Sequence, residues 1–197
     1  MYYEPDQLYH VYNRGNNRQQ VYFTPDHYLH FLRKVRQHIQ PHCQLLAYCL
    51  MPNHFHVLLY TTPDGCQTTS TPSSNRQPLT RGIAVALSSY TQGLNTQLNR
   101  TGALFQVKAK AILLPDTSGT YPRTCFHYIH QNPVRAKLAT SLEQWPYSSY
   151  PDYAGLRTGT LCNQLAAHQL LDIPTTPELF RQESAQAIPV EYVAGYK

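Results

Sequence analysis

The order in which strand-like and helix-like patterns follow one another constrains this chain more than any other feature. Alternating apolar and polar residues predict strands, and apolar residues spaced three and four apart predict helices. The patterns run strand, helix, strand, strand, helix, strand, helix. The first six match the split β-α-β order of ferredoxin-like and RRM-like folds, an α+β class with an antiparallel four-stranded sheet and two helices on one face. The predicted strands are 7–14, 44–50, 54–60 and 103–114, and the predicted helices are 25–40, 83–98 and 122–138.

The length of 197 residues suits one well-cored domain with a tail. We expect residues 1–150 to form the domain and residues 151–197 to form a looser, partly helical tail. Residues 61–80 are mostly Thr, Ser, Pro, Gln and Asn, which predicts a flexible insertion between core elements. Removing residues 63–78 is therefore expected to cost little stability.

Composition narrows the class of protein. No run of 18 apolar residues and no signal-like N-terminus occur, so we expect a cytoplasmic protein without a membrane span. The five cysteines are scattered and are expected to be reduced thiols. Residues 1–137 carry 13 Lys and Arg against 5 Asp and Glu, whereas residues 138–197 carry 3 against 6. A basic body rich in tyrosine suits a polyanion such as nucleic acid, although charge alone leaves an ordinary basic protein possible.

Two histidines stand one residue apart in the apolar run HFHVLLY, residues 54–60. Side chains two apart on a strand share a face, with Cα atoms about 6.5 Å apart. His54 and His56 can therefore converge on one point while Phe55, Val57 and Leu59 face a core. Converging neutral imidazoles form half of a metal site. Two half-exposed histidines with unrelated partners show the same spacing, so the pair alone leaves both interpretations open.

Five blocks in order resemble the REP-associated tyrosine transposases, which belong to the HUH superfamily of single-tyrosine, single-strand DNA transposases. The blocks cover most of residues 8–150, and each is weak alone. They are YHVYNRGNNRQQVY (9–22), MPNHFHVLL (51–59), GALFQVKAK (102–110), YIHQNPVRAKL (128–138) and WPYSS (145–149).

The resemblance implies that His54 and His56 are metal ligands, that Tyr128 is the nucleophile, and that Asn132 or Gln131 is the third ligand. Tyr128 and Asn132 share a helix face at i and i+4, but Pro133 disfavours helical geometry at Asn132, so Gln131 stays open. The implied cofactor is Mg²⁺ or Mn²⁺, and the implied reaction is DNA nicking and rejoining through a 5′-phosphotyrosine.

DNA contacts are predicted at polar and basic side chains of two segments. Phosphate contacts position DNA without reading its sequence. The lysines of 103–114 share one face of the predicted strand, and the others lie in the turn YNRGNNR. The predicted contacts are Asn13, Arg14, Asn16, Arg18, Lys108 and Lys110.

Several alternatives remain open at this stage. A tyrosine on a helix is more often a packing residue than a nucleophile, and Tyr121 and Tyr147 lie close enough in the sequence to be alternatives to Tyr128. His127 and His130 are assigned no catalytic role. A nucleic-acid-binding protein of the same fold that does not cleave is the first rival. A Zn²⁺ hydrolase is the second, although it lacks a third ligand at a clear spacing. The expected partner is single-stranded or hairpin DNA, bound by a monomer or a homodimer.

Overall fold

A four-stranded antiparallel sheet organises the computed structural model, which describes residues 1–68, 76–115 and 120–188. Its strand order is β2-β3-β1-β4, with every neighbouring pair antiparallel. This is the order of the split β-α-β motif, so the predicted fold class is confirmed. The strands are β1 (Leu8–Arg14), β2 (Cys43–Met51), β3 (His54–Thr61) and β4 (Lys110–Leu113).

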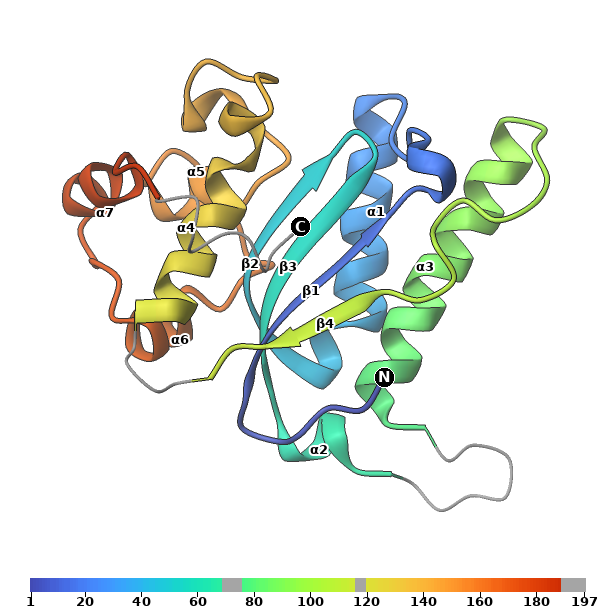
Figure 1. Cartoon of the computed structure of the whole chain (residues 1–197), viewed down its shortest axis with the longest axis horizontal. Helices are drawn as coiled ribbons and strands as arrows, with labels where there is room; N and C mark the ends of the chain where they lie inside the picture. The colour runs from blue at the N-terminus through green and yellow to red at the C-terminus, as the bar shows by residue number, and fades with distance from the viewer. Residues whose placement is uncertain (69–75, 116–119, 189–197) are drawn as a thin grey trace.

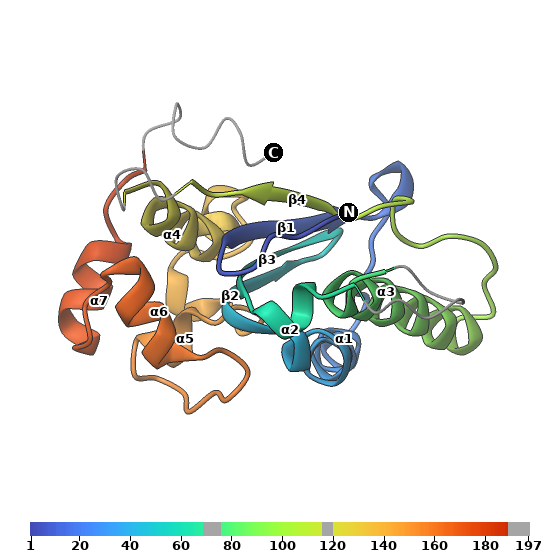
Figure 2. The same cartoon turned by 90° about the horizontal axis from the view of Figure 1, so that it is seen from below.

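Two long helices, α1 (Pro25–His38) and α3 (Pro78–Gln97), cover one face of the sheet (Figures 1 and 2). Their apolar sides meet the inward-facing residues of β3, where Phe55, Val57 and Leu59 are buried as predicted. Phe31 of α1 packs on Phe55 with ring centroids 5.1 Å apart. The opposite face of β3 is therefore the one that carries His54 and His56.

A third long helix, α4 (Thr120–Arg135), lies against β2 and β3, on the side of the sheet away from α3 (Figure 1). It begins two residues before Pro122 and ends at Arg135, earlier than predicted. Pro133 lies inside it.

The remaining helical elements are short. They comprise the turns η1 (Asn16–Arg18), η2 (Gln40–His42) and η3 (Leu142–Gln144), and the helices α2 (Pro63–Cys66), α5 (Tyr150–Tyr153), α6 (Gln164–Leu171) and α7 (Pro177–Ser184).

The fourth strand is shorter than the sequence predicts. Lys110 pairs with Tyr12, but Phe105 pairs with Gly15, so the segment before β4 contains two more residues than β1 does over the same span. This bulge interrupts the strand, and Lys108 lies outside β4. The prediction that Lys108 and Lys110 share one strand face is therefore wrong.

The polar range 61–80 enters the core at both ends. Thr61 belongs to β3, residues 63–66 form α2, and α3 begins at Pro78. Cys66 and Gln77 are both buried. Residues 69–75 of the predicted insertion lie outside the described residues. Because Cys66 and Gln77 are buried, we now expect that removing residues 63–78 would destabilise the fold.

The chain beyond residue 150 also packs into the domain as far as it is described. The predicted helical pieces correspond to α6 and α7. Phe180 of α7 is fully buried and contacts Phe126 of α4 with ring centroids 6.1 Å apart. Across the described ranges, no helix combines the length and apolar character that crossing a bilayer requires.

Candidate active site

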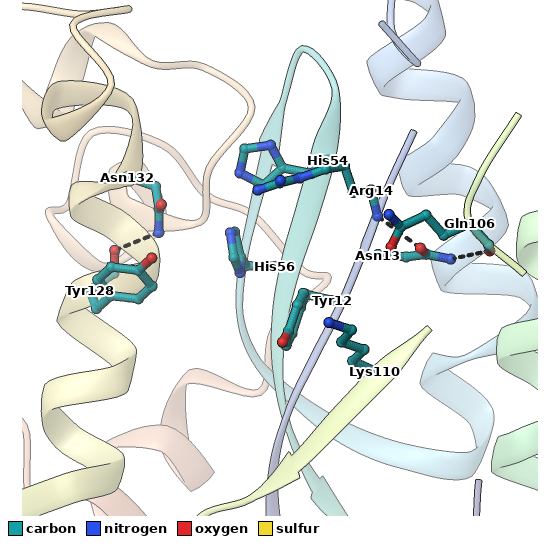
Figure 3. A pocket seen from close by; sticks show the side chains of 9 residues that line it. All are labelled: Tyr12, Asn13, Arg14, His54, His56, Gln106, Lys110, Tyr128 and Asn132. Atoms are coloured by element: carbon teal, nitrogen blue, oxygen red, sulfur yellow. Dashed lines mark hydrogen bonds between the residues drawn. The ribbon is translucent and has the colours of Figure 1, made fainter. Parts of the chain in front are cut away.

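The side chains of His54 and His56 project from β3 into the space between the sheet and α4, with ring centroids 5.0 Å apart (Figure 3). Nδ1 of His54 lies 2.6 Å from Oδ1 of Asn53, and Nδ1 of His56 lies 2.8 Å from Nε2 of His10. Burial lowers the pKa of His54 to about 4, and it also holds the pKa of His56 well below its usual value. Both imidazoles are therefore neutral at pH 7, the state in which a ring nitrogen binds a metal.

Tyr128 and Asn132 face these histidines from α4 (Figure 3). The Tyr128 and His56 rings have centroids 6.0 Å apart and are nearly perpendicular, at 79°. The Asn132 amide donates from Nδ2 to the Tyr128 carbonyl at 2.8 Å, so its Oδ1 is the atom that can act as a ligand. The i, i+4 spacing thus brings a phenol and a carboxamide to the same pocket.

Gln131 does not share this pocket. Its Nε2 donates to the carbonyls of Ser184 and Gln186 at 2.9 and 2.8 Å, which ties α4 to the end of α7. The two alternatives for the third ligand are therefore separated by geometry, with Asn132 beside the histidines and Gln131 turned toward the C-terminal helix.

The pocket has a volume of about 360 Å³. Arg14 and Lys110 contribute cationic groups to its wall, and none of the described residues that line it carries a carboxylate. A positively charged cavity with neutral imidazoles suits a phosphate group. Its lining residues are Tyr12, Asn13, Arg14, His54, His56, Gln106, Lys110, Tyr128 and Asn132.

Burial raises the pKa of the Tyr128 phenol, and the nearby Arg135 guanidinium opposes this shift. The Arg135 guanidinium carbon lies 5.8 Å from the centre of the Tyr128 ring. The phenol is therefore protonated at pH 7 and needs activation before it can attack phosphorus.

The other predicted tyrosines and histidines lie elsewhere. Tyr147 stacks on Tyr28 of α1 with ring centroids 3.7 Å apart, and Tyr121 is absent from the pocket lining. His127 contacts Glu183, with Nε2 2.6 Å from Oε1. His130 contacts Ser149, with Nε2 2.7 Å from Oγ. The two histidines thus hold α4 to the C-terminal part of the chain.

The predicted DNA contacts divide into two groups. Arg14 and Lys110 line the pocket, and Asn13 lines it as well, but the buried Asn13 amide donates to the Gln106 carbonyl at 3.1 Å. The structure separates Lys108 from this group, because Lys108 lines a different cavity between α3 and the loop before β4. Asn16 and Arg18 are exposed in η1 and do not line the pocket.

Sequence reasoning missed three residues of the site, His10, Tyr12 and Gln106. His10 and Tyr12 stand two apart on β1, and Tyr12 pairs with His56 across the strands. The Tyr12 ring lies 5.1 Å from the His10 ring and 5.8 Å from the His56 ring, between centroids. The same rule that paired His54 with His56 places His10, Tyr12 and Arg14 on one face, so the signal was present in the first strand.

The donor atoms fit a divalent cation of moderate hardness. Two neutral imidazoles and one amide oxygen leave room for phosphate oxygens and water, a set that Mg²⁺ and Mn²⁺ accept. Within the described residues, no group of three His, Cys, Asp or Glu side chains could hold a metal. The candidate ligands are the imidazoles of His54 and His56 and the amide of Asn132, which line the same pocket.

No protein-family model and no curated protein matches the sequence. A solved structure of a REP-associated tyrosine transposase bound to a REP hairpin matches with a TM-score of 0.55 and 16% sequence identity. The match covers 82% of this chain and 87% of that chain. The fold is shared with that transposase. This likeness is one of fold alone.

Weaker matches are found among bacterial tRNA(His) guanylyltransferase-like proteins. The complex with ATP has a TM-score of 0.41, 10% identity and coverage of 68% of this chain and 61% of that chain. The complex with GTP has a TM-score of 0.38, 10% identity and coverage of 70% and 71%, respectively. Both TM-scores are too low to support an argument about this chain.

Proposed function

We propose that this protein is a metal-dependent transposase or host-adapted relative that nicks and rejoins single-stranded DNA through a phosphotyrosine at Tyr128. The observation that carries the proposal is the meeting of Tyr128 and Asn132 with the His54–His56 pair in one cationic pocket. The shared fold with a transposase bound to a hairpin supports hairpin DNA as the substrate.

A phenol with a pKa near 10 is a poor nucleophile at pH 7, so the site must lower the barrier in other ways. Mg²⁺ or Mn²⁺ held by His54, His56 and Asn132 would polarise the scissile phosphate and stabilise the negative charge of the transition state. Arg14 and Lys110 add positive charge in the same pocket and orient the phosphate.

The chemical step exchanges one phosphodiester bond for another. The Tyr128 oxygen attacks phosphorus, a phosphorus–oxygen bond to the 3′-oxygen breaks, and the phenolic proton passes through solvent to that oxygen. The products are a 5′-phosphotyrosine and a free 3′-OH. Attack by a 3′-OH of another end reverses the step and rejoins the strand without ATP.

The decisive experiment detects the covalent adduct. Incubation with single-stranded hairpin DNA and Mn²⁺ should give a protein–DNA species that survives SDS and maps to Tyr128 by mass spectrometry. Tyr128→Phe should abolish the adduct and keep DNA binding, because only the nucleophilic oxygen is lost. Tyr121→Phe, on the same helix outside the pocket, serves as the matched control and should still form the adduct.

The alternative outcomes separate the rival functions. An adduct on Tyr12 would retain the pocket and reassign the nucleophile. Cleavage by Tyr128→Phe without any adduct would indicate attack by water and refute the transposase mechanism. Binding without cleavage by the wild type, in Mn²⁺ and with several hairpins, would favour the non-cleaving nucleic-acid-binding protein.

A further inference from the structure

A third histidine is hydrogen-bonded to the candidate metal site. His10 of β1 is fully buried, and its Nε2 lies 2.8 Å from Nδ1 of His56. The two ring centroids are 5.0 Å apart and the ring planes differ by only 19°. His10 does not line the pocket, so it acts on the site through His56.

The contact between two neutral imidazoles holds a single proton. In one arrangement His10 donates from Nε2 to Nδ1 of His56, so that His56 carries its own proton on Nε2. In the other arrangement His56 donates from Nδ1 to His10, and Nε2 of His56 keeps its lone pair. Only the second arrangement allows His56 to bind a metal through Nε2.

His54 shows the same arrangement with a different partner. Its Nδ1 lies 2.6 Å from Oδ1 of Asn53. An amide oxygen only accepts hydrogen bonds, so Nδ1 of His54 carries the proton and Nε2 carries the lone pair. Both histidines of β3 are thus held at Nδ1, one by Asn53 and one by His10.

We propose that His10 is a positioning residue whose Nε2 accepts a hydrogen bond from the Nδ1–H of His56 and thereby makes Nε2 of His56 the ligand atom. This inference rests on the proposed function, because it assumes that His54 and His56 bind a divalent cation. A hydrogen-bond partner on the second ring nitrogen orients a ligating histidine, and its loss typically weakens metal affinity tenfold to a hundredfold.

A matched pair of variants tests this role. In His10→Gln the amide oxygen reaches the position of Nε2 and can still accept a hydrogen bond, whereas His10→Leu has similar bulk and no acceptor. Calorimetric titration with Mn²⁺ should show a loss of affinity of about ten- to a hundredfold for His10→Leu. His10→Gln should stay close to the wild type. Equal affinity of His10→Leu and the wild type would overturn the inference and leave the proposed function intact.

A second measurement does not depend on folding of the variants. Long-range ¹H–¹⁵N spectra of the wild type in saturating Mg²⁺ should show His56 protonated at Nδ1 and His10 unprotonated at Nε2. The opposite pattern would contradict the inference directly. Absence of Mn²⁺ binding by the wild type and by both variants would refute the metal site of the proposed function, and the role of His10 with it.

Discussion

The side chain of Gln77 joins three separate parts of the chain at the start of α3. Its Oε1 accepts from the Tyr3 amide at 2.7 Å, and its Nε2 donates to the carbonyls of Tyr3 and Cys66 at 2.6 and 2.8 Å. Gln77 is 2% exposed, and Tyr3 is fully buried. These bonds fasten both the N-terminal segment and the end of α2 to α3.

Replacement of Gln77 by Ala leaves one buried amide and two buried carbonyls without this partner. Each buried polar group left unsatisfied costs about 1–3 kcal/mol. With partial relief from entering water, we expect Gln77→Ala to lower the free energy of unfolding by about 3–6 kcal/mol. For a chain of this size that corresponds to a fall in melting temperature of at least about 6 °C.

Urea denaturation followed by fluorescence measures this change, because the chain contains a single tryptophan. Trp145 is partly buried and donates from Nε1 to the Leu50 carbonyl at 3.0 Å, so its environment changes on unfolding. Gln67→Ala is the control, since Gln67 is the same residue type in the same polar range but is exposed. Gln67→Ala should change stability by less than about 0.5 kcal/mol. Similar effects of the two variants, or none, would refute the anchoring role of Gln77.

Three further predictions address the site and its pH dependence. His56→Ala should abolish Mn²⁺-dependent cleavage in a gel assay and largely keep DNA binding, since phosphate contacts elsewhere supply affinity. EDTA should have the same effect on the wild type. Full cleavage by His56→Ala, or by the wild type in EDTA, would refute the metal site. Lys110→Ala should slow cleavage about tenfold or more, whereas Lys108→Ala should have little effect, because of these two lysines only Lys110 lines the pocket. Equal cleavage rates of the two variants would contradict this role of Lys110. Burial holds the pKa of His130 well below its usual value, so the unfolded chain takes up a proton that the folded chain excludes, and stability should fall as pH drops below about 6.5. His130→Gln should reduce that fall between about pH 7 and pH 5 in urea midpoints, and an unchanged slope would refute the assignment.

The spacing of apolar residues predicted the sheet and the long helices, because an element that buries one face shows this in the sequence of the element itself. Phe55, Val57 and Leu59 alternate with His54, His56 and Leu58, and the side of β3 that carries Phe55 meets α1. The α3 helix begins five residues earlier than its apolar spacing indicates, at Pro78. Proline at the first helical position favours that start, which the apolar spacing alone does not mark.

Errors arose where distant contacts decide the local structure. The apolar and polar residues of 103–114 keep alternating through the bulge, so the sequence predicts one continuous strand. The backbone of Gln106, however, is held by β1, because its N–H donates to the Arg14 carbonyl and its carbonyl accepts from the Asn13 side chain. Gln77 is polar in a polar range, and its burial depends on Tyr3, 74 residues away. The residues next to Gln106 and Gln77 in the sequence do not indicate either of these contacts.

The choice between Asn132 and Gln131 as third ligand depends on whether Pro133 ends the helix, and here the local preference of proline does not decide the structure. Proline disfavours helical geometry at the preceding residue, and it also removes the amide that would bond to the carbonyl four residues earlier. In α4 the helix nevertheless continues past Pro133 to Arg135. The buried Asn132 side chain donates to the Tyr128 carbonyl, and Gln131 is held by the carbonyls of Ser184 and Gln186. These tertiary and side-chain bonds outweigh a penalty of a few kcal/mol, so the i, i+4 geometry survives. That geometry keeps an amide oxygen beside the candidate nucleophile, which a helix ending at Gln131 would not provide.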